Sequence, residues 1–136
     1  MISIFCKISL KDVNLNNIKE IDEKVFIEIF EAMRSNDSLV RFEAANCDVT
    51  DYAAAVLNTA LEQNRTLKSL NLDTNLIGPD TLGGLFEAIS SSNSTIIEVH
   101  VNDQAQSNMG YDKMTIFFIF QMYNQSVYSF SRTKVA

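Results

Sequence analysis

The sequence has little proline and glycine, with one proline and four glycines in 136 residues. Flexible linkers are rich in such residues, so the chain is expected to form a single domain over residues 1–136. Its apolar fraction of 46% is enough to build a core at this length. Long apolar runs are missing too, because the longest apolar cluster, "IFFIF" at 116–120, is far too short to span a bilayer.

Positive charge is also scarce. Eleven Lys and Arg stand against 17 Asp and Glu, which gives a formal net charge of −6. Proteins that bind nucleic acids or anionic membranes through charge use clustered basic residues, so we expect neither partner. An acidic surface favours a basic or mixed protein partner, but only weakly, because solubility alone also accounts for such a charge.

The two cysteines and the single histidine exclude several kinds of site. Two cysteines do not form a disulfide framework, and a reducing cytoplasm fits them. No Cys/His group has zinc spacing, and no phosphate-binding loop is present, because Gly83-Gly84 lies within a helical pattern. His100 falls at an outward strand position, where a lone histidine is more often a surface residue than a base. The sequence therefore predicts no enzyme, no metal and no cofactor.

The feature that the sequence does contain is an internal repeat. Four segments begin with Asn-x-Ser/Thr and start 28, 29 and 31 residues apart, at Asn36, Asn64, Asn93 and Asn124. A further copy lacks the asparagine and begins at Leu10. The aligned leading residues are Leu10, Leu39, Leu67 and Ile96. Internal periods of this size indicate a solenoid.

The shared pattern is L-x-x-L-x-L-x-x-N/C-x-L, the leucine-rich-repeat signature. Its clearest copy has Leu67, Leu70, Leu72, Asn75 and Ile77 at these positions. Alternate residues of a strand point to one side, so the apolar positions are expected in the core. The Asn or Cys is expected to turn inward and to bond backbone groups at the bend. Cys47 occupies this position in another copy, and we interpret it as buried and structural. Gln104 occupies it in the copy that begins at Ile96. The predicted core includes Leu70, Leu72, Val99 and Val101.

Apolar stripes of helical period separate the strands. They comprise Val25, Phe26, Ile29, Phe30 and Met33, then Val56, Leu57, Ala60 and Leu61, then Leu82, Leu85, Phe86 and Ile89. The helices are expected to start at Asp22, at Thr50-Asp51 and at Gly78-Pro79, and a fourth is expected at 112–123. The fold class is therefore α/β: a short leucine-rich-repeat solenoid, resembling the ribonuclease-inhibitor type. It is expected to have about five strand–helix units, with a parallel sheet on the concave face and helices on the convex face.

The Asn-x-Ser/Thr segments permit two interpretations. They match the acceptor motif for N-glycosylation, which would place the chain in the secretory pathway. They also fall at one phase of the repeat, where a helix ends and the next strand begins. Asparagine suits a left-handed helix-ending residue, and the Ser or Thr can hydrogen-bond within the turn. The repeat phase favours structural corners.

Outward strand positions and the loops after the strands are candidate binding surfaces. One row on the concave side is Asn14, Glu43, Asn71 and His100, and the adjacent row is Asp12, Arg41, Ser69 and Glu98. Ala45, Asp73 and Asn102 lie to the other side, and the loops carry Asn46, Asp48, Thr74, Asn75, Asp103, Gln104 and Gln106. This face is either a docking surface for a basic patch or a solvated polar face. The partner-binding candidates are Asn14, Glu43, Asn71, Asp73, His100, Asp103, Gln104, Phe117 and Phe118.

The last expected helix, "MTIFFIFQMY", is apolar around most of its circumference. A surface helix normally has a polar side. Either another element or a partner covers this helix, or it packs more deeply than usual. We favour the first explanation and predict that Phe117, Phe118 and Phe120 are not all buried by their own chain.

Three segments resemble the C-terminal leucine-rich-repeat domain of the tropomodulins and leiomodins. They are "ISLKDVNLNNIKEI" at 8–21, "TLKSLNLDTNLIGPDTLGGLFEAI" at 66–89 and "VNDQAQ" at 101–106. The resemblance covers nearly the whole chain, and it implies actin binding, capping of filament pointed ends, regulation of filament length and a cytoskeletal location. The N-terminal half of that family, which binds tropomyosin, has no counterpart here. The family's terminal helix beyond the last strand is also lacking, so this chain is a fragment or a short relative.

Two other functions remain open. A leucine-rich-repeat horseshoe can serve as a general interaction domain, for example an inhibitor or scaffold. A GTPase-activating factor can share this type of repeat, but it would need an arginine placed on a loop edge, and an acidic tail often accompanies it. Arg41 and Arg65 are the only repeat-face candidates and no acidic tail is present, so this third function is the weakest.

Overall fold

The computed structural model describes residues 9–91 and 95–105 of the chain. Strands and helices alternate along these residues: β1 (Asp12–Asn14), α2 (Glu23–Met33), β2 (Arg41–Glu43), α3 (Asp51–Leu61), β3 (Ser69–Asn71), α4 (Pro79–Ser91) and β4 (Glu98–His100). Several predictions fall outside the described residues, namely the helix at 112–123, the corners at Asn93 and Asn124, and Gln106, Phe117, Phe118 and Phe120.

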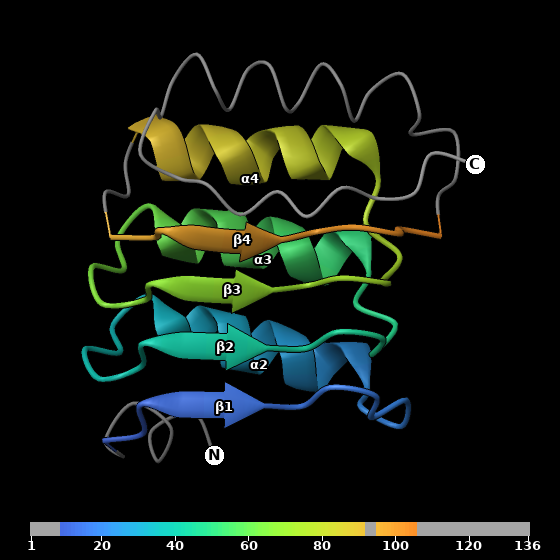
Figure 1. The fold of residues 1–136 in the computed structure, drawn as a ribbon, viewed down its shortest axis with the longest axis horizontal. Coiled ribbons are helices and arrows are strands. Elements are labelled where there is room, and N and C mark those ends of the chain that lie inside the picture. The colour runs from blue at the N-terminus through green and yellow to red at the C-terminus, as the bar shows by residue number, and fades with distance from the viewer. Residues whose placement is uncertain (1–8, 92–94, 106–136) are drawn as a thin grey trace.

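The four strands form one parallel sheet in chain order, and the helices lie behind it (Figure 1). Asp12 pairs with Arg41, Arg41 with Ser69, and Ser69 with Glu98. These partners are 29, 28 and 29 residues apart, so one coil of the solenoid corresponds to one copy of the repeat. The predicted α/β leucine-rich-repeat fold is confirmed.

The core lies between the sheet and the helices. Phe42, Leu70 and Val99 stand in the middle of successive strands and are at most 1% exposed. Leu72 and Val101 follow β3 and β4 and are buried as predicted. Burial of each such side chain contributes about 1.5–3 kcal/mol, which makes the stacking of coils the main source of stability.

Leu10 is the exception among the aligned leading residues. It is 40% exposed, whereas Leu39, Leu67 and Ile96 are at most 2% exposed. Leu10 belongs to the first described coil, and β1 pairs only with β2 among the described strands. A coil that has a described neighbour on one side alone covers the same sequence position less fully. Ile18, on this same coil, is also 40% exposed.

The helices begin where the sequence predicted. The side chain of Asp22 caps α2 by accepting a hydrogen bond from the Lys24 N–H at 2.9 Å, and that of Thr50 caps α3 by accepting from the Ala53 N–H at 3.3 Å. Pro79 is the first residue of α4, a position where its missing N–H costs no helical bond. Among the described residues, none of the helices has both the length and the apolar character that a membrane span requires.

Aromatic side chains join the first described helix to the sheet. The rings of Phe26 and Phe30, one turn apart on α2, stack with centroids 5.7 Å apart. Phe30 also meets the ring of Phe42 on β2 edge-on, with centroids 5.7 Å apart. Edge-on and offset contacts are the favourable geometries for aromatic pairs, so this cluster fixes α2 against the sheet.

The asparagine corners at Asn36 and Asn64 are buried, with 4% and 2% of their surface exposed. The Oδ1 of Asn64 accepts hydrogen bonds from the N–H of Thr66 at 3.0 Å and of Leu67 at 2.9 Å. Its Nδ2 donates to the carbonyl oxygen of Met33, one coil earlier, at 2.8 Å. A buried and fully bonded amide leaves no space for a glycan, so the structural interpretation of these two corners is confirmed.

The expected mechanism of these corners was wrong in one respect. Neither Asn36 nor Asn64 has a positive φ; the described non-glycine residues that do are Asn17, Asn46, Asp48, Thr74 and Asp103, all after strands. The side-chain oxygen of each corner asparagine accepts the N–H groups that follow it, so the backbone can turn without entering the left-handed region.

Candidate protein-interaction surface

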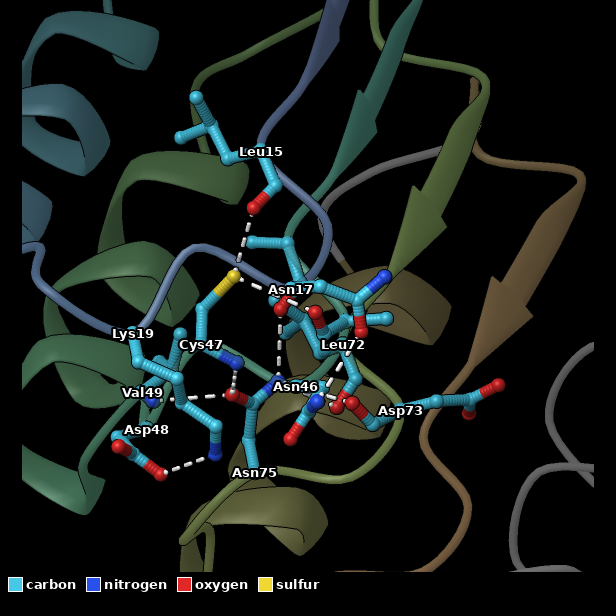
Figure 2. Close-up of polar contacts among 12 residues, drawn as sticks. Leu15, Asn17, Lys19, Asn46, Cys47, Asp48, Val49, Leu72, Asp73 and Asn75 are labelled. Atoms are coloured by element: carbon cyan, nitrogen blue, oxygen red, sulfur yellow. Dashed lines mark hydrogen bonds and ion pairs between the residues drawn. The ribbon is translucent and has the colours of Figure 1, made fainter.

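A ladder of buried polar side chains holds the loops that leave the strands. The Sγ of Cys47 donates to the carbonyl oxygen of Leu15 at 2.9 Å, and the Nδ2 of Asn75 donates to that of Ala44 at 2.9 Å. The Oδ1 of Asn75 also accepts from the N–H of Cys47 at 3.0 Å and of Val49 at 2.9 Å (Figure 2). Cys47 and Asn75 are 0% and 1% exposed. The predicted inward position of the Asn or Cys is confirmed.

Gln104 continues this ladder in the fourth coil, as its place at the Asn/Cys position of the repeat predicts, and this burial corrects its prediction as a partner contact. It is 5% exposed. Its Oε1 accepts from the Ile77 N–H at 3.0 Å, and its Nε2 donates to the carbonyl oxygen of Leu72 at 2.8 Å. A buried amide that is bonded to backbone on both sides is structural. Asn102, which we placed on the exposed side of the sheet, is also buried.

Four residues with positive φ occupy one position of successive coils. They are Asn17 (66°), Asn46 (56°), Thr74 (57°) and Asp103 (55°), and we call them the loop edge. The Nδ2 of Asn46 donates to the Oδ1 of Asn17 at 3.0 Å, so the first two coils are joined along this edge. Asn and Asp tolerate the left-handed region, whereas the branched Cβ of threonine makes it unfavourable by roughly 1–3 kcal/mol.

Two rows of outward side chains cross the sheet, as predicted. They are Asp12, Arg41, Ser69 and Glu98 in one row, and Asn14, Glu43, Asn71 and His100 in the other. We call the two rows the concave face. Adjacent strands lie about 4.8 Å apart, so each side chain can reach its neighbours in the same row.

Some candidates on this surface also hold the loops. The Oδ1 of Asn14 accepts from the Asn16 N–H at 2.9 Å, and the Oδ1 of Asn71 accepts from the Asp73 N–H at 2.9 Å. The Oδ1 of Asp73 in turn accepts from the Asn102 N–H at 2.6 Å. Part of each side chain is therefore committed to the fold, which fixes the direction in which Asn14, Asn71 and Asp73 are presented.

A hydrogen-bonded pair lies at the β4 side of the concave face. The Oε1 of Glu98 is 2.8 Å from the Nε2 of His100, and the Oε2 of Glu98 accepts from the Oγ of Ser69 at 3.1 Å. The bond to His100 lowers the pKa of the Glu98 carboxyl; burial opposes this, and Ser69 and the nearby Arg41 add to the lowering. The Glu98 carboxylate is thus charged and paired at neutral pH.

The remaining charges of the concave face differ in their pairing. The Nε of Arg41 lies 3.6 Å from the Oδ1 of Asp12, and both side chains are largely exposed. Within the described residues, the carboxylate of Glu43 makes no hydrogen bond or ion pair, and neither does that of Asp103 on the loop edge. Glu43 is therefore the unpaired carboxylate at the centre of the concave face, between Asn14 and Asn71.

Sequence reasoning missed the loop of the first coil. The Nζ of Lys19 forms an ion pair with the Oδ1 of Asp48 at 2.9 Å (Figure 2), and the Oδ1 of Asn16 accepts from the Ala45 N–H at 2.8 Å. Both contacts join residues 29 positions apart. The repeat period was the available signal, because it places Asn17 and Lys19 beside Asn46 and Asp48.

Metal-binding groups and unpaired buried polar atoms are absent from the described part of the chain. Residues 9–91 and 95–105 contain no group of three or more His, Cys, Asp or Glu side chains arranged to hold a metal ion. Within these ranges every buried side-chain nitrogen or oxygen has a hydrogen-bond partner. The concave face and the loop edge are therefore the candidate binding features of the described surface.

A parallel sheet with one strand per coil, helices behind it and a buried Asn/Cys ladder define a leucine-rich-repeat domain. Domains of this class commonly bind other proteins. This chain belongs to the tropomodulin and leiomodin family: the family model described as the TMOD/LMOD leucine-rich domain matches residues 7–132.

The curated relatives are longer proteins. Tropomodulin-4 of Mus musculus is 34% identical over 97 residues, which cover 71% of this chain and 28% of the relative. The tropomodulin of Caenorhabditis elegans is 30% identical over 101 residues, covering 74% of this chain and 26% of the relative. Human leiomodin-1 is 30% identical over 107 residues, covering 79% and 18%. The chain thus spans about a quarter of the length of the tropomodulins and less of leiomodin-1.

Two solved structures have the same fold. The structure of leiomodin-1 actin-binding site 2 superposes with a TM-score of 0.78 at 28% identity, covering 86% of this chain and 66% of that one. The tropomodulin C-terminal domain of Caenorhabditis elegans superposes with a TM-score of 0.86 at 23% identity, covering 99% and 81%. At 23% identity, the likeness to the tropomodulin C-terminal domain shows a shared fold alone.

Proposed function

We propose that this domain binds actin as a module of the tropomodulin type. The observation that carries the proposal is the likeness to leiomodin-1 actin-binding site 2, with a TM-score of 0.78 at 28% identity. A fold hosts many functions, so the proposal also depends on a suitable surface in this chain.

The proposed contact surface is the concave face together with the loop edge. Its candidate residues that are exposed or half-exposed are Asn14, Glu43, Asn71, Asp73, His100 and Asp103. The buried ladder and the backbone bonds between coils hold these residues in fixed positions. A rigid surface loses little conformational freedom on binding, which favours affinity. Phe117 and Phe118 remain further candidates outside the described residues.

Charge suggests which part of actin this surface meets. Two of the acidic side chains on the concave face are paired, Asp12 with Arg41 and Glu98 with His100. Glu43 has no such partner within the described residues. An unpaired carboxylate on a docking surface attracts a lysine or arginine of the partner and repels acidic alternatives. We therefore propose that the concave face meets a basic patch of actin, with Glu43 at its centre.

Actin assembly assays test this function. The full 136-residue chain is added to pyrene-labelled filaments whose barbed ends are blocked, and elongation from the pointed ends is followed. We expect slower elongation, together with binding to actin monomers at a Kd of about 1–50 μM, a range equivalent to roughly 6–8 kcal/mol. The absence of any effect on filament ends and of any monomer binding at about 50 μM would contradict the proposal.

A matched pair of variants tests the concave face. Glu43→Gln removes the unpaired charge with little change in shape, and we expect about three- to tenfold weaker actin binding, mainly at low salt. Glu28→Gln makes the same change on α2, on the helical side of the domain, where the side chain is exposed. That variant should bind like the wild type. Equal binding by both variants would remove the concave face from the proposed contact.

We further propose that the domain contributes to pointed-end capping and to the regulation of filament length, in the cytoplasm and without catalysis. We also propose that tropomyosin binding belongs to parts of the longer relatives that this chain does not span, since the match covers 28% of tropomodulin-4. The elongation assay is therefore repeated with tropomyosin-coated filaments. We expect the effect of this chain to be the same with and without tropomyosin, and a marked enhancement would reject that assignment.

A general protein-interaction role is the second candidate, and the unpaired carboxylates favour it because any basic partner could meet them. The two candidates differ in what inhibits binding. If actin is the partner, excess monomeric actin displaces any other protein bound to the concave face, and Glu43→Gln weakens the binding of actin and of that protein together. If the domain is a general interaction module, excess actin does not displace the bound protein.

A further inference from the structure

Thr74 stands out on the loop edge because its backbone conformation does not suit its side chain. Its φ of 57° lies in the left-handed region, which residues with a branched Cβ rarely adopt. The corresponding residues of the other coils are Asn17, Asn46 and Asp103, and Asn and Asp tolerate this region. The third coil therefore contains a local conflict that asparagine would remove.

The surrounding loop imposes this conformation. The Thr74 N–H donates to the carbonyl oxygen of Asn102, one coil later, at 2.7 Å. On one side of Thr74, the Asp73 N–H is bonded to Asn71, and on the other side Asn75 is buried in the polar ladder. These bonds use the backbone of residue 74 and its neighbours, so the turn does not depend on a threonine side chain.

The Thr74 side chain contributes no bond to the loop. It is exposed, and its hydroxyl makes no hydrogen bond within the described residues. At the equivalent position, by contrast, the Asn46 side chain donates to Asn17. The unfavourable backbone of Thr74 is thus not offset by an intramolecular contact of its own side chain.

We propose that Thr74 is a contact residue for the protein partner, and that the partner binds its methyl and hydroxyl groups. Backbone strain without local compensation is concentrated at functional positions, and the inference runs from the strained residue to a role. The turn presents the side chain rigidly beside Asp73. This inference rests on the proposed actin-binding function and names one residue that carries specificity within it.

Thr74→Asn tests the inference, because binding and stability should move in opposite directions. Relief of the strained backbone should raise the Tm by about 2–5 °C in thermal unfolding. Loss of the methyl and hydroxyl should weaken binding to monomeric actin about tenfold. Thr59→Asn makes the same change on α3, where Thr59 is exposed on the helical side, and it should leave actin binding unchanged.

Each outcome decides between the claims. If the wild type binds actin and Thr74→Asn binds equally well, the assignment of Thr74 is wrong and the proposed function stands. An unchanged or lower Tm also overturns the assignment, because the threonine is then not strained. If the wild type fails to bind actin, the proposed function is contradicted, and the role of Thr74 is rejected with it.

Discussion

The Sγ of Cys47 donates a hydrogen bond to the carbonyl oxygen of Leu15, 32 residues earlier in the chain, at 2.9 Å. One coil later, Asn75 makes the corresponding bond to Ala44 with an amide. A thiol is one weak donor, whereas a carboxamide supplies two donors and an acceptor. The same position of the repeat is therefore more strongly bonded in the third coil than in the second.

This difference predicts that truncation to alanine lowers the free energy of unfolding more at Asn75 than at Cys47. Asn75→Ala removes bonds to five backbone groups and leaves buried donors and acceptors unpaired, so we expect it to lower the free energy of unfolding by about 2–4 kcal/mol. Cys47→Ala removes a weaker donor from an equally buried position and should cost about 1 kcal/mol. Urea denaturation of the two variants measures both values. Similar losses in the two variants would contradict the ranking.

The corner at Asn64 predicts that two substitutions in one glycosylation motif lower the free energy of unfolding by different amounts. Asn64→Ala and Thr66→Ala both remove the same glycosylation motif, but the bonds they remove differ. Asn64 is buried and bonded to two N–H groups and two carbonyl oxygens, so its loss should cost about 2–4 kcal/mol. Thr66 makes one long bond, 3.4 Å to the carbonyl oxygen of Asn36, so its loss should cost less than about 1 kcal/mol. Thermal unfolding compares the two, and a small effect of Asn64→Ala would refute the structural corner.

Adjacent glycines of α4 predict opposite responses to alanine. A Cβ at Gly83 meets nothing within 4 Å, so Gly83→Ala should stabilise the helix by about 0.5–1 kcal/mol. A Cβ at Gly84 would lie 3.0 Å from the Nδ2 of Asn58, which donates to the carbonyl oxygen of Thr81 at 2.9 Å. Gly84→Ala should therefore lower the free energy of unfolding, because the contact between α3 and α4 must shift to admit the Cβ. Chemical denaturation of the two variants measures the sign of each change in the free energy of unfolding. Stabilisation by both substitutions would show that the Asn58 side chain moves away from the new Cβ at no cost.

The Glu98–His100 pair predicts a dependence of stability on pH. The folded pKa of Glu98 lies below its ordinary value of 4.5, so its contribution is present above that value and is lost as the pH falls through the folded pKa. The Glu98 side chain is 42% exposed, and we expect the contribution to be less than about 1 kcal/mol. The wild type should lose more stability than Glu98→Gln between about pH 5 and 3. Parallel curves for the two proteins in acid denaturation would exclude the effect.

Much of the fold could be predicted because the repeat is a local property of the sequence. The spacing of Leu70 and Leu72 indicates an inward side of a strand, and the next copy with Val99 and Val101 indicates where the following coil lies. Coils of equal length stack most simply with parallel strands in register. The core and the order of strands follow from these two facts.

The candidate site was less predictable, because its properties depend on residues from neighbouring coils. Glu43 and Glu98 are both outward carboxylates in the sequence, yet Glu98 is bonded to Ser69 and His100 while Glu43 is unpaired within the described residues. Gln104 shares the repeat position of Cys47 and Asn75, yet its place in a loop also makes it a binding candidate, and only its contacts show that its amide completes the buried ladder.

The repeat, the core positions and the helix starts follow from the sequence, because each copy has its own apolar spacing and capping residues and the copies recur at a nearly constant period. The tertiary structure decided which polar groups are paired, why Leu10 is exposed, and which residues turn left-handed after the strands. Those properties arise where one coil meets another 28 or 29 residues away, and the energies of such contacts exist only after the coils have stacked.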